Sequence, residues 1–197
     1  MNHSDPAGAR LGMWLFLFTE IMFFSGLFVL FAAYYYNHTD DFIRGSSELN
    51  VIIGTANTAV LLISSFFVAS AVRAVERKSK ISSIIMLGVS LSLGIVFLVN
   101  KYFEWSYKAG QGIYPGSDTL LEMPKGTIAF YNLYYFLTGL HAIHVIVGLV
   151  LLTVCLVIAI RVADNGKQLV LTDNVGLYWH LVDIIWIFLF PLFYLLS

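Results

Sequence analysis

Charged residues are scarce in this chain of 197 amino acids. Asp, Glu, Lys and Arg together make up 12% of the residues, whereas 59% are hydrophobic and 16% are aromatic. A soluble domain carries about 25% charged residues. The composition therefore excludes an ordinary soluble domain and predicts a chain that is embedded in a membrane.

Neither charge sign dominates, and cysteine is almost absent. The chain has 11 Lys and Arg residues against 12 Asp and Glu, so its formal net charge of −1 gives no basic field that would attract nucleic acid. Cys155 is the single cysteine. This count excludes an intramolecular disulfide framework and the cysteine-rich metal motifs.

Long apolar runs fill most of the chain. A membrane-spanning helix needs about 20 mostly apolar residues, and five stretches meet that length: 11–35, 51–72, 81–102, 129–160 and 175–196. The first apolar run is too long for the core of a cleavable signal peptide. The pattern predicts an all-α, polytopic membrane protein, a bundle of five helices that forms a single membrane domain over residues 1–197.

Lys and Arg are divided unequally between the two sides of this predicted bundle. The N-terminal side holds seven of them: Arg10, Arg73, Arg77, Lys78, Lys80, Arg161 and Lys167. The opposite side holds four: Arg44, Lys101, Lys108 and Lys125. Because short cytoplasmic loops carry the excess of Lys and Arg, we expect the N-terminus inside and the C-terminus outside. The longest loop is expected at residues 103–125, where Pro and Gly recur.

Ionisable side chains inside the apolar runs are the most informative residues, since each costs about 3 kcal/mol at the bilayer centre. With a rise of about 1.5 Å per residue, Glu20, His141 and Asp183 fall at one depth, and His144 and His180 lie slightly closer to the inside. His141 and His144 of the fourth span are spaced i, i+3 and share a helix face. His180 and Asp183 of the fifth span have the same spacing and also share a face. We expect the first, fourth and fifth spans to converge on a buried polar seam, in which carboxylates pair with imidazoles.

Small residues and side chains near the span ends predict packing and interfacial roles. Gly54 with Thr58, and Ser90 with Gly94, are small-xxx-small pairs that allow helices to approach closely. Lys101 and Glu104 are expected to form an exposed i, i+3 pair of little energetic value. The candidates for interfacial or lipid contact are Trp14, Arg73, Arg77, Glu104, Trp105, Arg161 and Trp186.

The sequence carries no recognisable catalytic or metal motif. Di-iron sites in helix bundles use Glu-x-x-His repeats, and zinc needs three or four converging ligands. The chain also has no nucleophile elbow and no Gly-rich phosphate loop. We therefore expect no catalytic centre and no metal or haem bound by this chain. Glu20, which lies among phenylalanines, is either a packing residue or a proton carrier.

Three segments resemble subunit III of the haem–copper oxidases, the family that includes cytochrome c oxidase and related quinol oxidases. They are LGMWLFLFTEIMFFSGLF (11–28), LTGLHAIHVIVG (137–148) and YWHLVDIIWIFL (178–189), and they occur in the family's order. Residues 57–65 are similar more loosely. Five spans, in place of seven, resemble the short bacterial form that lacks the first two helices.

This resemblance implies a non-catalytic subunit of a proton-pumping terminal oxidase in the bacterial inner membrane. Its main partner would be subunit I, together with subunit II and other oxidase subunits, and these partners would carry the haem and copper. Members of the family bind phospholipid in a cleft between their helices. In a five-span chain this cleft would lack one wall. Glu20 matches the family's carbodiimide-reactive glutamate, and the remaining seam residues match polar positions that brace the helices: His141, His144, His180 and Asp183.

Two other functions remain open from the sequence. One is a subunit III-like protein associated with nitric oxide reductase, whose sequence is similar. The other is an independent proton or ion transporter that uses Glu20 and the histidines. Transporters commonly contain internal repeats and broken helices, and neither is visible in this sequence.

Overall fold

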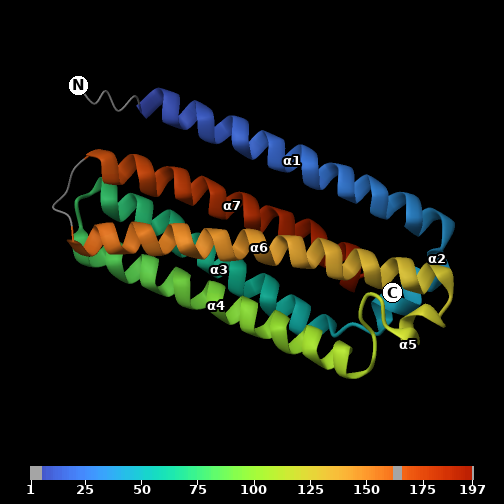
Figure 1. Cartoon of the computed structure of the whole chain (residues 1–197). Coiled ribbons are helices and arrows are strands. Elements are labelled where there is room, and N and C mark those ends of the chain that lie inside the picture. The colour runs from blue at the N-terminus through green and yellow to red at the C-terminus, as the bar shows by residue number, and fades with distance from the viewer. Residues whose placement is uncertain (1–5, 162–165, 197) are drawn as a thin grey trace.

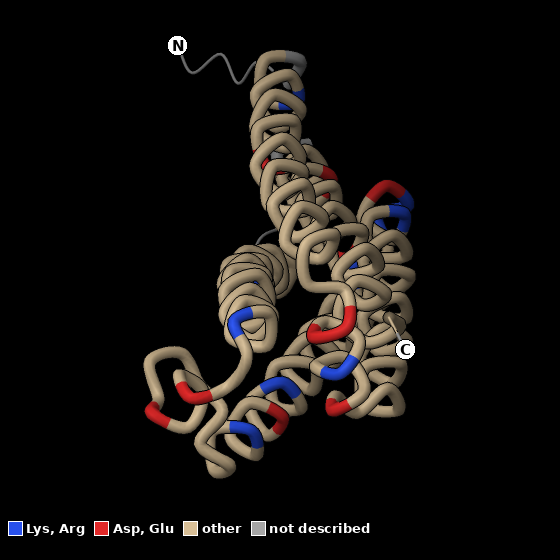
Figure 2. The backbone as a smooth tube through the Cα atoms, turned by 90° about the vertical axis from the view of Figure 1, so that its right-hand side faces the viewer, with Lys and Arg blue, Asp and Glu red and all other residues tan. Residues whose placement is uncertain are grey.

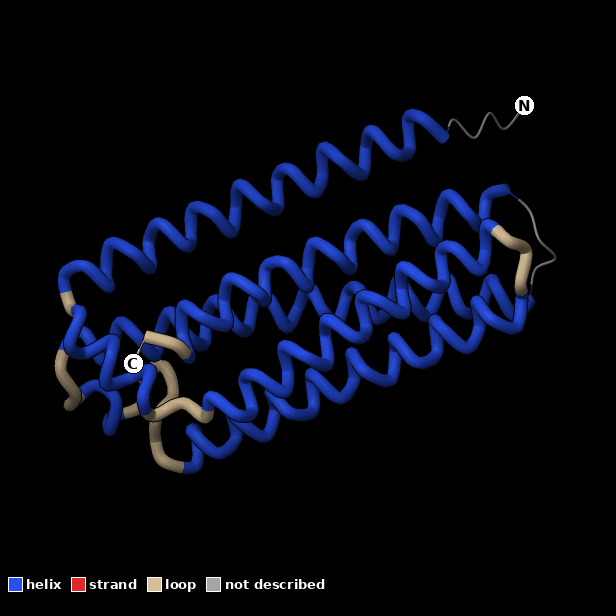
Figure 3. The backbone as a smooth tube through the Cα atoms, turned by 180° about the vertical axis from the view of Figure 1, so that it is seen from behind, coloured by secondary structure: helices blue, strands red, loops and turns tan. Residues whose placement is uncertain are grey.

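The apolar stretches fold as helices, as expected for a backbone that must satisfy its own hydrogen bonds in lipid. The computed structural model describes residues 6–161 and 166–196, and over these residues it contains helices and no strand (Figures 1 and 3). The helices of this part of the chain are α1 (Pro6–Asn37), α2 (Thr39–Ser47), α3 (Val51–Glu76), α4 (Lys80–Gly110), α5 (Asp118–Leu121), α6 (Lys125–Arg161) and α7 (Gly166–Tyr194).

Five of the helices, α1, α3, α4, α6 and α7, are long and apolar enough to cross a membrane, which confirms the predicted fold class. Figure 2 shows long uncharged stretches in these helices. The predicted end of the third span was wrong, because α4 continues past Tyr102 to Gly110. The loop expected at 103–125 is therefore shorter, and it contains the short helix α5.

The start of α1, the turn between α3 and α4, and the end of α6 lie at one end of the bundle (Figure 1). The short helices α2 and α5 lie at the other end (Figure 1). Successive spans that cross the membrane in opposite directions require this arrangement. Which end faces the cytoplasm stays a prediction from the distribution of Lys and Arg.

α7 occupies a central place, since it packs against α1, α2, α3 and α6. Its two tryptophans, Trp179 and Trp186, are fully buried in the core. In contrast, among the described residues α1 contacts α2, α6 and α7 but neither α3 nor α4. Figures 1 and 3 both show α1 at the edge of the bundle. Much of its apolar surface is exposed, including Trp14 and Phe18.

Small residues lie where α3 and α4 pack together. The Ser64 hydroxyl donates to the Ser90 carbonyl at 3.1 Å, and the Ser90 hydroxyl donates to the Ser64 carbonyl at 3.2 Å. A Cβ atom on Gly94 would lie 2.7 Å from the Leu149 side chain and 2.9 Å from Trp179. Gly94 is therefore required for the approach of α4 to α6 and α7.

The turn between α3 and α4 is tight and closed by backbone hydrogen bonds. Lys78 has a φ of 59°, in the left-handed region. Its N–H donates to the Val75 carbonyl at 3.0 Å, and the N–H of Ser79 donates to the Ala74 carbonyl at 2.9 Å. This pair of bonds is a Schellman motif. It fixes the end of α3 relative to the start of α4.

Candidate functional site

A half-buried carboxylate on α1 meets an imidazole on α6. Glu20 Oε2 lies 3.1 Å from His144 Nε2, and the two side chains are 19% and 16% exposed. The Phe24 ring packs edge-on against the His144 ring at 5.3 Å between centroids. The pair therefore joins α1 to the rest of the bundle inside an apolar, aromatic setting.

The other nitrogen of His144 determines which ring nitrogen carries a hydrogen. His144 Nδ1 is 2.8 Å from the Leu140 carbonyl oxygen, which only accepts, so Nδ1 carries a hydrogen. Nε2 and the Glu20 carboxyl then share one further proton, held either as a neutral acid and imidazole or as an ion pair. In both forms the net charge of the pair is zero, which lowers the cost of placing it at membrane depth.

The remaining residues of the predicted seam do not form a second carboxylate–imidazole pair. His180 Nδ1 hydrogen-bonds to the Ser65 hydroxyl, which joins α7 to α3. Asp183 is 3% exposed, and neither of its oxygens has a hydrogen-bond partner within the described residues. His141 is fully buried between the rings of Phe97 and Trp186, and in the same residues its two nitrogens have no hydrogen-bond partner.

The structure thus places all five predicted seam residues inside the protein or at its helix contacts, but it brings only Glu20 and His144 into a pair. Asp183 lies inside the bundle and does not face lipid. The pairing of Asp183 with an imidazole, expected from the sequence, has no counterpart among the hydrogen bonds of the described residues. The direction of each side chain around its helix decided the contacts, and the common depth of these residues stays a prediction.

A second polar cluster, which sequence reasoning missed, joins α4, α6 and α7. Lys101 Nζ lies 3.2 Å from Glu104 Oε2 and donates to the hydroxyl groups of Tyr134 at 3.1 Å and Tyr194 at 2.9 Å. Both tyrosine hydroxyls also lie near Glu104 Oε1, at 2.6 Å and 2.5 Å. We call these four residues the Lys101–Glu104 cluster.

Burial makes this cluster different from the exposed pair that the sequence predicted. The side chains of Lys101 and Glu104 are 1% and 6% exposed. The ammonium group also lies 5.3 Å from the centre of the Trp186 ring, a cation–π contact. The expectation that this pair is exposed was therefore wrong, because α4 continues as a helix and turns this face into the bundle.

A helical repeat in the sequence was the signal for this cluster. Buried residues recur on α4 at intervals of three and four, and the repeat continues beyond the predicted end of the span. They are Ser83, Leu87, Ser90, Gly94, Phe97, Lys101, Glu104 and Lys108. Lys108 is held by Glu48 Oε2 at 3.5 Å and by the Tyr131 hydroxyl at 3.4 Å.

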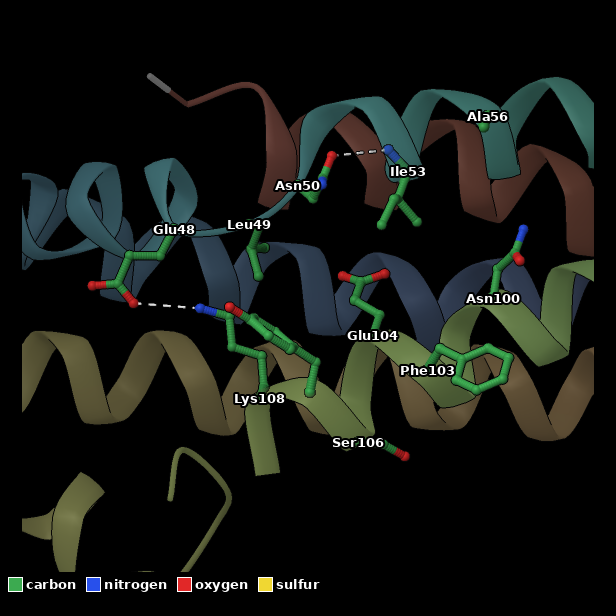
Figure 4. Close-up of a pocket in the computed structure, with 11 residues that line it drawn as sticks. Glu48, Leu49, Asn50, Ile53, Ala56, Asn100, Phe103, Glu104, Ser106 and Lys108 are labelled. Carbon is green, nitrogen blue, oxygen red and sulfur yellow. Dashed lines mark hydrogen bonds and ion pairs between the residues drawn. The ribbon is translucent and has the colours of Figure 1, made fainter. Parts of the chain in front are cut away.

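A pocket of about 810 Å³ opens beside this cluster, between the start of α3 and the end of α4. Figure 4 shows the Glu48–Lys108 pair at one end of the pocket, Asn100 at the other, and Glu104 between them. Asn100 donates to Asn57 Oδ1 at 2.8 Å and so ties α4 to α3. Apart from the Glu48–Lys108 pair, the charged and amide groups at this pocket therefore hydrogen-bond to residues behind its wall: Asn100 to Asn57, and Glu104 to Lys101 and the two tyrosines.

The candidates for lipid contact divide into two groups. Trp14, Arg73, Arg77 and Arg161 are exposed, and Trp105 is half-buried. Trp186 is 1% exposed and Glu104 is 8% exposed. The lipid-contact expectation was wrong for these last two, because Trp186 fills the core and donates from Nε1 to the Thr58 hydroxyl at 3.0 Å.

The clusters described above are not arranged as metal sites. Within residues 6–161 and 166–196, no three His, Cys, Asp or Glu side chains come together in a way that would hold a metal ion. The polar groups that do meet link one helix to another: α1 to α6, α3 to α7, and α4 to α6 and α7.

Comparison with known proteins gives the family. The family model described as cytochrome c oxidase subunit III matches residues 2–197. The chain belongs to the cytochrome c oxidase subunit III family. This result confirms the resemblance seen in the first, fourth and fifth spans, and with it the main functional interpretation, a subunit III of a haem–copper oxidase.

Individual subunit III relatives agree with this assignment. A probable cytochrome c oxidase subunit 3 of Rickettsia bellii (strain RML369-C) is 30% identical, over 98% of this chain and 72% of the relative. Cytochrome c oxidase subunit 3 of a Synechocystis species is 30% identical, over 99% of this chain and 78% of the relative. A haem–copper oxidase subunit I+III of Aeropyrum pernix is 31% identical, over 94% of this chain and 22% of the relative.

Proposed function

We propose that this chain is a non-catalytic subunit of a proton-pumping haem–copper terminal oxidase, and that it stabilises subunit I and the region where protons enter it. It lies in the bacterial cytoplasmic membrane with its N-terminus inside. The haem and copper are carried by partner subunits. Subunit I is the main partner, with subunit II and other oxidase subunits nearby.

The observation that supports this proposal is that the polar groups between the helices bind to one another across helix contacts. The Glu20–His144 pair and the Lys101–Glu104 cluster each connect different helices. Groups arranged in this way brace a bundle, which is what a stabilising subunit needs. The printed name of the Aeropyrum pernix relative, subunit I+III, supports an association of subunit III with subunit I in the family.

The surface of α1 is the best placed for that association. α1 packs on the bundle from one side, and its exposed apolar side chains form a long surface that other apolar groups can cover: Leu11, Trp14, Leu15, Phe18, Ile21 and Met22. Glu20 lies on this same helix. Its side chain lies on the opposite face of α1 and contacts His144 of α6, so a partner on the exposed face would cover α1 from the outside and hold it against the bundle.

Purification of the native complex tests the proposal. The chain is isolated from its own membranes through an affinity tag, and the co-purifying subunits are identified by mass spectrometry while haem is measured by absorption. We expect a haem–copper subunit I in stoichiometric amount. A complex that contains this chain but no haem–copper subunit would refute the proposal.

Deletion of the chain tests the stabilising role. The complex that lacks it is expected to retain haem and initial oxygen consumption but to lose activity faster during turnover. Proton flux by vesicles that contain this chain alone, abolished by Glu20→Gln, would instead support a transporter. Equal inactivation rates with and without the chain would contradict the stabilising role.

A further inference from the structure

A pocket of about 330 Å³ lies where α3 ends and α4 begins. One face of each helix supplies the lining residues, which recur along the chain at intervals close to one or two helical turns. The polar ones are Ser70 and Arg73 of α3, Arg77 directly after α3, Ser79 directly before α4, and Ser82 of α4. The pocket therefore combines two cationic side chains with several hydroxyl groups.

The two arginines have no anionic partner in the part of the chain that the structure describes. The ion pairs among these residues involve Arg10, Lys101, Lys108 and His144, and neither Arg73 nor Arg77. Glu76 is the one acidic residue between positions 66 and 90, and it does not line the pocket. Like charges at i and i+4 repel one another. An anion between the two guanidinium groups would remove this repulsion.

The start of α4 adds hydrogen-bond donors at the same place. The Ser79 hydroxyl makes no capping hydrogen bond to the helix, and it donates to Ser82 Oγ at 2.9 Å. The amides of the first turn of α4 have no partner inside the helix, and the helix dipole is positive at this end. The Schellman turn at Lys78 joins Arg77, which follows α3, to this first turn of α4.

The surface next to the pocket is apolar on the side of the membrane interior. Phe66 lies one turn before Ser70 on α3 and is 68% exposed, and Ile85 of α4 is 53% exposed. A phospholipid places its phosphate at the membrane surface and its acyl chains toward the bilayer centre. The surface has the same order, with cationic groups at the end of the span and exposed apolar side chains nearer the bilayer centre.

We propose that this pocket binds the phosphate of an anionic phospholipid. Arg73 and Arg77 hold the phosphate oxygens through charge-assisted hydrogen bonds. Ser82 and the first amides of α4 donate to the same group. The acyl chains run along Phe66 and Ile85 toward the bilayer centre. This site is separate from the Glu20–His144 pair and does not depend on the proposed function.

Photo-cross-linking of the full chain in nanodiscs tests this site. The substitution Ile85→p-benzoylphenylalanine places the photo-cross-linker next to the pocket. The nanodiscs contain equal amounts of phosphatidylglycerol and phosphatidylcholine. Mass spectrometry gives the ratio of the two lipid adducts. We expect phosphatidylglycerol to exceed phosphatidylcholine, and each Arg73→Gln or Arg77→Gln substitution to lower the ratio about fivefold, since a basic side chain near the surface is worth about 1 kcal/mol.

Matched controls separate this site from a general effect of charge. Arg161→Gln removes one exposed cation from the same end of the bundle outside the pocket, and it should leave the ratio unchanged. If the Gln variants do not fold, Arg73→Lys and Arg77→Lys keep the charge and lose the forked geometry, and they should still lower the ratio. Equal amounts of the two lipid adducts in the chain with Arg73 and Arg77 intact would overturn the proposal. It would also be overturned if none of the four Arg73 and Arg77 substitutions changed the ratio of the two adducts.

Competition by inorganic phosphate distinguishes a phospholipid from free phosphate as the ligand of this pocket. Phosphate in excess is compared with chloride at the same ionic strength. A phospholipid site keeps its preference for phosphatidylglycerol, because the acyl chains contribute to binding. Loss of the preference in phosphate alone would show that the pocket takes free phosphate, and it would overturn the assignment to a lipid.

Discussion

Lys101 and Glu104 lie 3.2 Å apart at positions i and i+3 of α4, and both side chains are buried where α4, α6 and α7 meet. A buried ion pair contributes little compared with a well-packed apolar pair. Removing one partner is costly, however, since it leaves a charge in the interior without compensation.

Substitution of one member of this pair should therefore destabilise the bundle. For Lys101→Met or Glu104→Gln we expect a loss of about 3–5 kcal/mol, which lowers the thermal midpoint in detergent by about 6–20 °C. Lys125→Met removes an exposed lysine and is the matched control. The double variant should lose less than the sum of the single ones. A midpoint for Lys101→Met equal to that of Lys125→Met would contradict the burial of this pair.

Glu20→Gln should preserve the contact between α1 and α6. A Gln amide donates to His144 Nε2 while His144 Nδ1 keeps its bond to Leu140. The complex should assemble with its haem content and oxygen consumption largely retained. Glu20→Leu leaves the imidazole without a partner and should cost about 1–3 kcal/mol. Subunit yield and haem absorption measure both outcomes, and haem loss in Glu20→Gln would argue against a non-catalytic role.

Two glycines of α4 should respond in opposite ways to alanine. Gly94→Ala places a methyl group against Leu149 and Trp179, and overpacking of this kind costs about 1–3 kcal/mol. Gly88 has nothing within 4 Å of an added Cβ atom, so Gly88→Ala should be neutral or stabilise the helix by up to about 1 kcal/mol. Thermal midpoints of the two variants provide the comparison. Equal midpoints would show that α4 does not approach Trp179 as closely as described.

Asp183→Asn should leave stability unchanged or increase it. The carboxyl group is buried and has no hydrogen-bond partner in the described part of the chain, and a group in this position costs free energy. Asn has nearly the same shape and no charge. Thermal unfolding in detergent measures the effect. A fall of more than about 4 °C, equivalent to about 1 kcal/mol or more, would reveal a partner for this carboxyl group.

The sequence predicted the five spans because long apolar runs depend only on local composition. It did not predict the length of α4, since Lys101, Glu104 and Lys108 were interpreted as the charged end of a span. Their spacing of three and four continues the buried face of Gly94 and Phe97. The helical period was therefore more informative here than the charge of each residue.

The partner of each buried polar group was harder to predict than its depth. His141 and His144 are one turn apart, yet the first faces Phe97 and Trp186 and the second faces Glu20. The rotation of a helix about its own axis decides such contacts, and this rotation depends on the packing of all its neighbours. A single sequence does not contain that information in local form.

The central position of α7 has a consequence for biogenesis. Ribosomes synthesise this helix after the other four spans, and it supplies His180 to Ser65, Trp186 to Thr58 and Tyr194 to Lys101. Until α7 enters the bilayer, Ser65 and Thr58 therefore lack their partners on α7, and Lys101 has only its contacts to Glu104 and Tyr134. The contacts that α7 makes with α1, α3 and α6 can therefore form only after these helices have been joined by α7 in the membrane.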